Sequence, residues 1–165
     1  MAAVKPRLLD LFCCAGGAAR GYQMAGFHVT GVDIKPQPRY AGDVFVQGDA
    51  LEYVAAHGHE FDAIHASPPC QAYSLTQRIR GNRHPDLIAA TRNALQAAGL
   101  PYVIENVRGA PLTNQVVLVG SMFGLMTMRH RLFECSFSIP FELAPPPAGK
   151  YAKMGRLAKH GEYMH

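Results

Sequence analysis

Short apolar runs alternate along the chain with segments whose apolar residues recur at helical spacing. We expect strands at 8–13, 27–34, 44–47, 61–66, 102–105, 116–119 and 131–137. Helices are expected between them, at 18–25, 51–56 and 85–98. Because strands separated by helices form βαβ units, the pattern predicts an α/β fold with a mainly parallel, twisted sheet and helices on both faces.

The pattern changes near the C-terminus. Residues 144–149 read Ala-Pro-Pro-Pro-Ala-Gly, the composition of a stiff, extended linker. The segment that follows is basic, with Lys150, Lys153, Arg156 and Lys159. We therefore expect one folded domain over residues 1–143 and a Pro-rich linker with a basic tail over 144–165.

The composition narrows the class of protein. With 165 residues, 48% apolar and 17% charged, the chain is expected to fold as one domain with its own core. This composition excludes an intrinsically disordered chain. A net charge of +4 permits an anionic partner without specifying one. No apolar run has the length of a membrane span, and no signal peptide is recognisable, so we expect no membrane association.

The four cysteines, Cys13, Cys14, Cys70 and Cys135, do not form a CxxC pair. A zinc site is therefore not expected, and two adjacent cysteines do not indicate a disulfide framework. We interpret Cys13, Cys14 and Cys135 as packing residues. The cysteine usage indicates a reducing compartment, and we expect a cytoplasmic protein without a bound metal.

Cys70 is the most informative of these residues. It follows the strand expected at 61–66 and the dipeptide Pro68-Pro69, which ends the strand and stiffens the turn. The thiol is thereby expected at the carboxyl end of a strand, where open α/β sheets bind ligands. A cysteine displayed there is a candidate nucleophile. The alternative is a buried structural cysteine.

The segment 10–21 predicts a strand, a glycine turn and the start of a helix. Gly16 and Gly17 let a ligand approach the backbone, and the helix N-terminus offers free N–H groups. Asp33 ends the next strand, where an acidic side chain can accept hydrogen bonds from ribose hydroxyls. Asp49 ends the third strand, within reach of an adenine amino group. The alternative for both acids is a turn or helix-capping role.

The spacing of the glycines also indicates which class of ligand the turn can bind. The turn holds only two adjacent glycines, which differs from the GxGxxG pattern of dinucleotide sites. A nucleoside without a pyrophosphate therefore fits this turn better than a dinucleotide does.

Taken together and in order, these motifs resemble the cytosine-C5 DNA methyltransferase family. The resemblance covers about residues 8–135 and rests on Asp10-Leu11-Phe12, Gly16-Gly17, Asp33, Asp49, Pro69-Cys70-Gln71, Glu105-Asn106-Val107 and Arg129-His130-Arg131. It implies a Rossmann-like S-adenosylmethionine-dependent methyltransferase fold, with residues 1–143 as the catalytic domain and DNA as the partner.

The resemblance implies a cofactor site for S-adenosylmethionine, with S-adenosylhomocysteine as the product. Its residues are Asp10, Phe12, Cys13, Gly16, Gly17, Asp33, Ile34, Asp49, Ala50 and Pro68. Phe12 is expected to stack on the adenine, Asp33 to hold the ribose and Asp49 to hold the adenine amino group. Gly16 and Gly17 are expected to form the turn at the methionine side.

The resemblance also implies four catalytic residues. Cys70 is expected to attack C6 of a flipped-out cytosine, which makes C5 nucleophilic toward the methyl group. Glu105 is expected to contact N3 and the exocyclic amine, and Arg129 and Arg131 to cover the O2 side. Nearby arginines favour the thiolate form of the cysteine.

The segment after Cys70 has the composition of a DNA-facing loop, and the expected DNA contacts are Gln71, Ser74, Arg78, Arg80 and Arg83. The alternative for these arginines is an ordinary solvated basic loop.

The sequence departs from the family pattern at several positions. Cys14 stands where the first glycine of the cofactor turn is usual, Asp33 where glutamate is more typical, and Thr127 where glutamine often precedes the two arginines. Only 34 residues follow Arg131, which leaves no room for a full target-recognition region.

These departures keep several interpretations open. The chain is expected to be a minimal enzyme of phage or restriction-modification type, or half of a split enzyme whose second chain supplies target recognition, or a degenerate remnant. Two alternatives in function remain beside the DNA enzyme. One is a non-catalytic cofactor- or DNA-binding module that needs a partner chain, and the other is an RNA cytosine methyltransferase.

Overall fold

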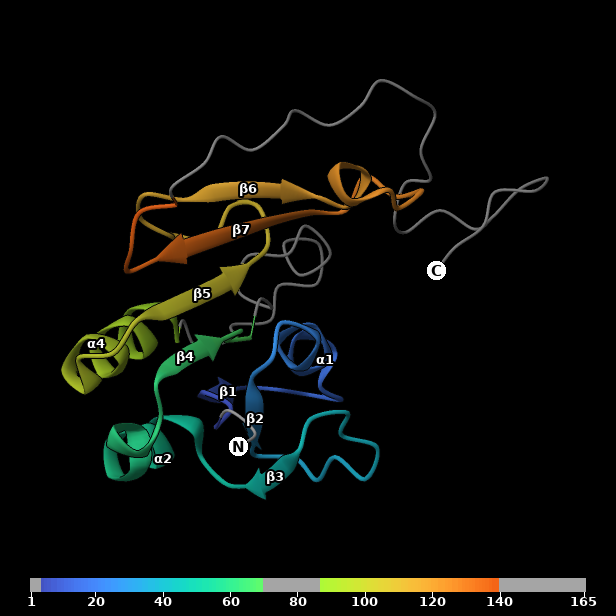
Figure 1. Cartoon of the computed structure of the whole chain (residues 1–165). Helices are drawn as coiled ribbons and strands as arrows, with labels where there is room; N and C mark the ends of the chain where they lie inside the picture. The colour runs from blue at the N-terminus through green and yellow to red at the C-terminus, as the bar shows by residue number, and fades with distance from the viewer. Residues whose placement is uncertain (1–3, 70–86, 140–165) are drawn as a thin grey trace.

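The computed structural model describes residues 4–69 and 87–139, and its core is one seven-stranded sheet (Figure 1). The strands are β1 (Arg7–Leu11), β2 (His28–Asp33), β3 (Val44–Gln47), β4 (Ala63–Ala66), β5 (Tyr102–Asn106), β6 (Val116–Val119) and β7 (His130–Cys135). The helices are α1 (Gly17–Met24), α2 (Ala50–His57) and α4 (Ile88–Ala98), with short 3₁₀ turns η1 (Gly58–Glu60) and η3 (Gly120–Phe123).

The strand order is β3-β2-β1-β4-β5-β7-β6. The first five strands of this order pair in parallel, and β7 is antiparallel to both β5 and β6. The predicted fold class, a Rossmann-like α/β fold with a mainly parallel sheet, is confirmed. The order of the strands reverses between β1 and β4, and ligands of open α/β sheets bind at such a switch point.

Helices cover both faces of the sheet because the central strands carry apolar side chains on both sides. Leu8 of β1 packs with Ala19 of α1 on one face. On the other face, Leu9 packs in a larger core that includes Val54 of α2 and Leu95 of α4. Each fully buried leucine contributes about 1.5–3 kcal/mol. This two-sided burial is typical of parallel sheets and holds the switch point rigidly.

A buried ion pair joins α4 to β7. Arg92 donates from Nε to Glu134 Oε1 at 2.7 Å and from Nη2 to Oε2 at 2.7 Å. The same carboxylate accepts the Thr113 backbone N–H at 2.8 Å. Burial raises the pKa of Glu134, but these hydrogen bonds outweigh it and hold the pKa below its ordinary value. The antiparallel end of the sheet is thereby fixed to the helical layer.

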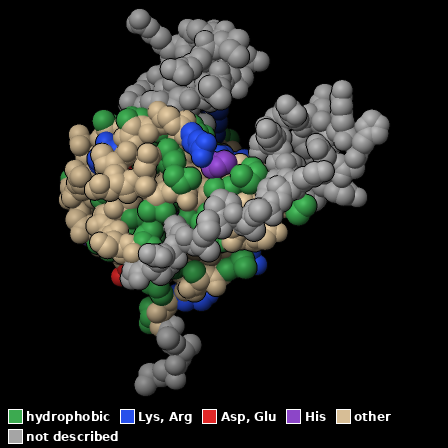
Figure 2. All heavy atoms as spheres, turned by 90° about the horizontal axis from the view of Figure 1, so that it is seen from above, with side chains coloured by type: hydrophobic (Ala, Val, Ile, Leu, Met, Phe, Trp, Pro, Cys, Tyr) green, Lys and Arg blue, Asp and Glu red, His purple; other side chains and the backbone are tan. Residues whose placement is uncertain are grey.

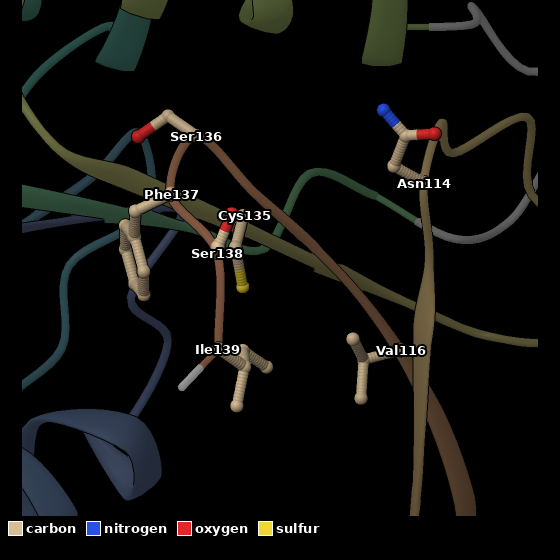
Figure 3. Close-up of a pocket in the computed structure, with 7 residues that line it drawn as sticks. All are labelled: Asn114, Val116, Cys135, Ser136, Phe137, Ser138 and Ile139. Carbon is tan, nitrogen blue, oxygen red and sulfur yellow. The ribbon is translucent and has the colours of Figure 1, made fainter. Parts of the chain in front are cut away.

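One cavity lies away from the switch point. It has a volume of about 590 Å³, and Figure 3 shows that its lining comes from the start of β6 and from the chain around the end of β7. Cys135, one of its lining residues, pairs with Val103 near the amino end of β5. This cavity is therefore at the edge of the sheet opposite to the one where β1 and β4 end.

Metal ions and membranes were both expected to be absent. In 4–69 and 87–139, no group of three or more His, Cys, Asp or Glu side chains is placed to hold a metal ion. None of the helices in these ranges is long and apolar enough to cross a membrane.

Candidate functional site

Two cavities lie where β1, β2, β4 and β5 end. The first, which we name the Asp33 cavity, has a volume of about 360 Å³. It is lined by Phe12, Cys14, Asp33, Ile34, Lys35, Gln37, Asp49, Ala50, Ser67, Pro69 and Leu87. Five of the ten predicted cofactor residues are thus brought together in one hollow: Phe12, Asp33, Ile34, Asp49 and Ala50.

The second, which we name the Glu105 cavity, has a volume of about 810 Å³. Its lining comes from α1, β4, β5 and the β6–β7 region, and consists of Cys13, Ala18, Gly21, Tyr22, Ala25, His65, Ser67, Glu105, Leu118, Phe123, Arg129, Arg131 and Phe133. Figure 2 looks onto the β6–β7 side of the molecule and shows basic and histidine side chains bordered by apolar ones. Three of the four predicted catalytic residues line this cavity.

Asp33 is held firmly at the end of β2. The side chain is buried, Oδ2 accepts the Cys14 backbone N–H at 3.0 Å, and Oδ1 accepts the Lys35 backbone N–H at 2.9 Å. Each carboxylate oxygen has a further lone pair to offer a ligand. The arrangement therefore presents an oriented acceptor pair to the cavity, suited to vicinal hydroxyl groups.

The turn between β1 and α1 has an unusual backbone. Phe12 and Cys14 adopt positive φ angles of 58° and 46°, and Gly16 has a φ of 85°. A Cβ at Gly16 would lie 2.8 Å from the Tyr40 ring, so only glycine fits there. At Gly17 an added Cβ would meet no heavy atom within 4 Å, which leaves open space at the start of α1.

Asp49 has the capping role that was the alternative to ligand binding. It is the N-cap of α2, and Oδ1 accepts the backbone N–H groups of Leu51 and Glu52 at 2.8 and 3.0 Å. The side chain is also exposed and lines the Asp33 cavity. One carboxylate thus caps the helix and borders the hollow.

Asp10 is a buried carboxylate of β1, with an exposed fraction of 0%. It pairs with Gly31 of β2 and His65 of β4, and among the described residues neither of its oxygens has a hydrogen-bond partner. Burial raises its pKa to about 7, and the Asp33 charge adds to the increase. A buried acid without a partner is costly, and a cationic ligand group would relieve that cost.

The remaining predicted cofactor residues lie elsewhere. Cys13 lines the Glu105 cavity, while Asp10, Gly16, Gly17 and Pro68 line neither cavity. Cys13 is buried, in keeping with its predicted packing role, and also borders the Glu105 cavity, whereas Cys14 is exposed and differs from that role. In Cys13, burial raises the pKa of the thiol to about 12, so it stays protonated.

Glu105 and Arg131 form an ion pair across β5 and β7, with 2.6 Å between Oε1 and Nε. Burial raises the pKa of Glu105, and the positive charges of Arg131 and Arg129 oppose that increase. A carboxyl whose pKa is raised keeps its proton to a higher pH than an ordinary glutamate, which favours a role as a proton or hydrogen-bond donor.

Tyr22 and His65 also line the Glu105 cavity, and sequence reasoning did not select them. The Tyr22 Oη lies 3.1 Å from His65 Nδ1. Burial lowers the pKa of His65 to about 4, so the imidazole is neutral at pH 7. Neither residue lies in a recognisable motif, and the pair forms only when α1 packs on β4.

Asn106 connects the end of β5 to the proline turn. Its Nδ2 donates to the Pro68 carbonyl oxygen at 2.9 Å, and its Oδ1 accepts the Val107 backbone N–H at 2.9 Å. Pro69, the next residue, lines the Asp33 cavity. The buried amide therefore fixes the backbone that leads to position 70.

The predicted nucleophile and DNA contacts lie outside the described residues. They are Cys70, Gln71, Ser74, Arg78, Arg80 and Arg83. The proline turn before Cys70 is described up to Pro69, and it ends beside both cavities because Ser67 lines each of them. A hollow with ribose-type acceptors thus adjoins a hollow with an acid–arginine pair.

This chain is similar in sequence to two Type II methyltransferases. It is 31% identical over 122 residues to M.XorII of Xanthomonas oryzae pv. oryzae, covering 64% of this chain and 29% of that protein. It is 27% identical over 128 residues to M.AquIA of Picosynechococcus sp., covering 64% of this chain and 50% of that protein. The chain thus spans at most half the length of these Type II methyltransferases. No protein-family model matches the sequence.

A solved structure supports the fold alone. A hypothetical protein of Thermus thermophilus superposes with a TM-score of 0.52 at 18% identity, over 79% of this chain and 74% of that one.

Proposed function

We propose that this chain is the catalytic part of a DNA cytosine-C5 methyltransferase that uses S-adenosylmethionine and a Cys70 nucleophile. The observation that carries the proposal is the meeting of two cavities at Ser67, three residues before Cys70. One cavity presents the Asp33 acceptors, and the other presents the Glu105–Arg131 pair.

The Asp33 cavity fits the adenosine part of S-adenosylmethionine. Asp33 would accept the ribose hydroxyls, Phe12 would provide the aromatic wall, and Asp49 would face the adenine amino group. The open space at Gly17 would accommodate the methionine part of the cofactor. The carboxylate of Asp10, which has no hydrogen-bond partner within 4–69 and 87–139, would be neutralised by the ammonium group of that part. When bound, this cofactor supplies an electrophilic methyl group on a sulfonium.

The Glu105 cavity fits a cytosine that has left the DNA helix. The Cys70 thiolate would add to C6, while Glu105 protonates or hydrogen-bonds N3 and so stabilises the electron pair that moves into the ring. Arg131 holds Glu105 in place, and Arg129 adds positive charge beside the base. After methylation at C5, loss of the C5 proton and departure of the thiolate restore the aromatic ring.

The test is mass spectrometry of nucleosides from DNA incubated with the chain and S-adenosylmethionine. We expect 5-methylcytosine with wild type and none with Cys70→Ala, which keeps the described cofactor residues unchanged. A parallel reaction with transfer RNA as the only substrate tests the RNA alternative. Equal 5-methylcytosine from Cys70→Ala would exclude Cys70 as the nucleophile.

A second candidate is a split enzyme that is active only with a partner chain. Exposed apolar side chains at Phe123, Leu125 and Met126 favour it, since Phe123 lines the Glu105 cavity and the other two follow it closely in the chain. S-adenosylhomocysteine binding without turnover, with turnover restored by a recognition domain added in trans, would favour this candidate over the first.

A further inference from the structure

The backbone of Phe12 is in a conformation that an aromatic residue rarely adopts. Its φ of 58° lies in the left-handed region, which is sterically unfavourable for side chains larger than glycine. Such a conformation persists only where surrounding contacts hold it. The Phe12 side chain lines the Asp33 cavity, so this backbone geometry decides where the ring lies.

Ser67 supplies the contact at the Phe12 carbonyl. Its Oγ donates to the Phe12 carbonyl oxygen at 3.2 Å, and its backbone N–H donates to the Leu11 carbonyl oxygen at 3.1 Å. On the far side of the same peptide, the Cys13 N–H donates to the Val32 carbonyl oxygen at 3.1 Å. The peptide after Phe12 is therefore held at its oxygen by the residue that follows β4 and at its nitrogen by β2.

We propose that Ser67 is a positioning residue whose hydroxyl keeps the Phe12 ring in place as a wall of the cofactor cavity. This inference rests on the function proposed above. Ser67 acts through Phe12 and not on the reacting atoms. Because the bond from Val32 is made by backbone atoms, the hydroxyl is the part of this arrangement that a substitution can remove.

The Ser67 hydroxyl should affect cofactor affinity more than folding. Loss of the hydroxyl frees the Phe12 carbonyl while the backbone pairing of Ser67 with Leu11 remains. Ser67→Ala should therefore weaken the binding of the adenosine part, whereas Ser67→Thr keeps a hydroxyl and should restore it. Without the phenyl ring, the position of the Phe12 backbone should no longer matter for the cofactor.

The experiment is isothermal titration calorimetry with S-adenosylhomocysteine on the full chain. The proteins are wild type, Ser67→Ala, Ser67→Thr, Phe12→Leu and the double variant with Phe12→Leu and Ser67→Ala. Loss of one hydrogen bond predicts a dissociation constant about fivefold higher for Ser67→Ala. We expect Ser67→Thr to match wild type and Ser67→Ala to add nothing in the Phe12→Leu background.

Ser136→Ala is the matched control. The Ser136 Oγ also bonds to a backbone group, since it accepts the Tyr102 N–H at 2.8 Å, but it lies at the opposite edge of the sheet. This variant should lower the midpoint of urea unfolding and leave the dissociation constant unchanged.

The outcomes distinguish the two proposals. A Ser67→Ala protein that binds like wild type, or that weakens binding equally with and without the Phe12 ring, would overturn the role of Ser67 and leave the proposed function intact. A wild-type chain that binds no S-adenosylhomocysteine would overturn the cofactor assignment, and the role of Ser67 with it.

Discussion

Asn106 donates its side-chain amide to the carbonyl oxygen of Pro68, so the end of β5 holds the turn that leads to Cys70. The residue is 2% exposed, and removing its amide leaves a buried carbonyl without this donor. We expect Asn106→Ala to lower the free energy of unfolding by about 1–3 kcal/mol. The turnover rate should fall by a larger factor than the affinity for S-adenosylhomocysteine. The substitution removes a hydrogen bond that holds the turn before Cys70, whereas Asn106 does not line the Asp33 cavity.

Urea unfolding and steady-state methylation assays check this prediction. Asn93→Ala, on the exposed face of α4, serves as the matched control; it should leave turnover unchanged and should not lower the free energy of unfolding, because alanine is the better helix former. Equal losses of cofactor affinity and turnover in Asn106→Ala would contradict the role given to the amide.

Arg131 opposes the effect of burial on Glu105. Burial raises the pKa of Glu105, and Arg131, 2.6 Å away, counteracts the increase. In Arg131→Gln the pKa of Glu105 should therefore rise further, and the pH at which the carboxyl ionises should move upward. Carbon-13 NMR of labelled glutamate side chains measures that pH directly.

Arg108→Gln is the control for this measurement, because Arg108 is exposed after β5 and lines neither cavity. This variant should leave the pH at which Glu105 ionises unchanged. An unchanged ionisation of Glu105 in Arg131→Gln would mean that the charge of Arg131 does not reach Glu105, and a downward shift would contradict the predicted direction.

Cofactor binding should release a proton from Asp10. Burial raises the pKa of this acid to about 7, so near neutral pH part of the apo molecules hold a proton on it. A bound ammonium group favours the carboxylate and lowers that pKa. Calorimetry of S-adenosylhomocysteine at pH 7, in buffers of different ionisation enthalpy, should therefore report a net release of protons on binding, and Asp10→Asn should abolish the release.

Asp10 also sets a pH dependence of apo stability. The unfolded acid ionises near 3.8 and the folded one near 7, so the folded state binds more protons between these values. Stability should therefore fall as pH rises through this window. Asp10→Asn should be the more stable protein at pH 8, and urea unfolding of both proteins at pH 5 and pH 8 tests the sign.

The Arg92–Glu134 pair stabilises the antiparallel end of the sheet. Arg92→Ala leaves a carboxylate that is 3% exposed without its cation, and such a loss costs about 3–5 kcal/mol. Urea unfolding measures it, with Arg108→Ala as the exposed control. Because the pKa of Glu134 is lowered, the contribution of the pair is complete above the ordinary glutamate value of 4.5 and is lost as pH falls through the lowered pKa.

The sequence predicted the strands well where apolar runs are bounded by polar or glycine residues. The strands expected at 44–47 and 116–119 have the observed bounds. The strand expected at 61–66 begins later, at Ala63. The Asp62 carboxylate accepts the Arg7 backbone N–H at 2.7 Å, so a side chain takes the donor that the backbone of a longer strand would use. The antiparallel direction of β7 depends on pairing with distant strands, which the local pattern does not contain.

The site was predictable to the extent that its residues follow strand ends. Asp33 and Asp49 were selected on that ground, and both line one cavity. Tyr22 and His65 were not selected, since only the packing of α1 on β4 brings them together. Ser67 gave no signal beyond its place before two prolines, because its hydrogen bond depends on the backbone angle of Phe12.

The two cavities share Ser67 and are otherwise lined by different residues. In the proposed enzyme, the walls around the methyl donor and those around the target base are therefore formed by different described residues, apart from Ser67. The affinity for one ligand can change by substitution without altering the surface that meets the other.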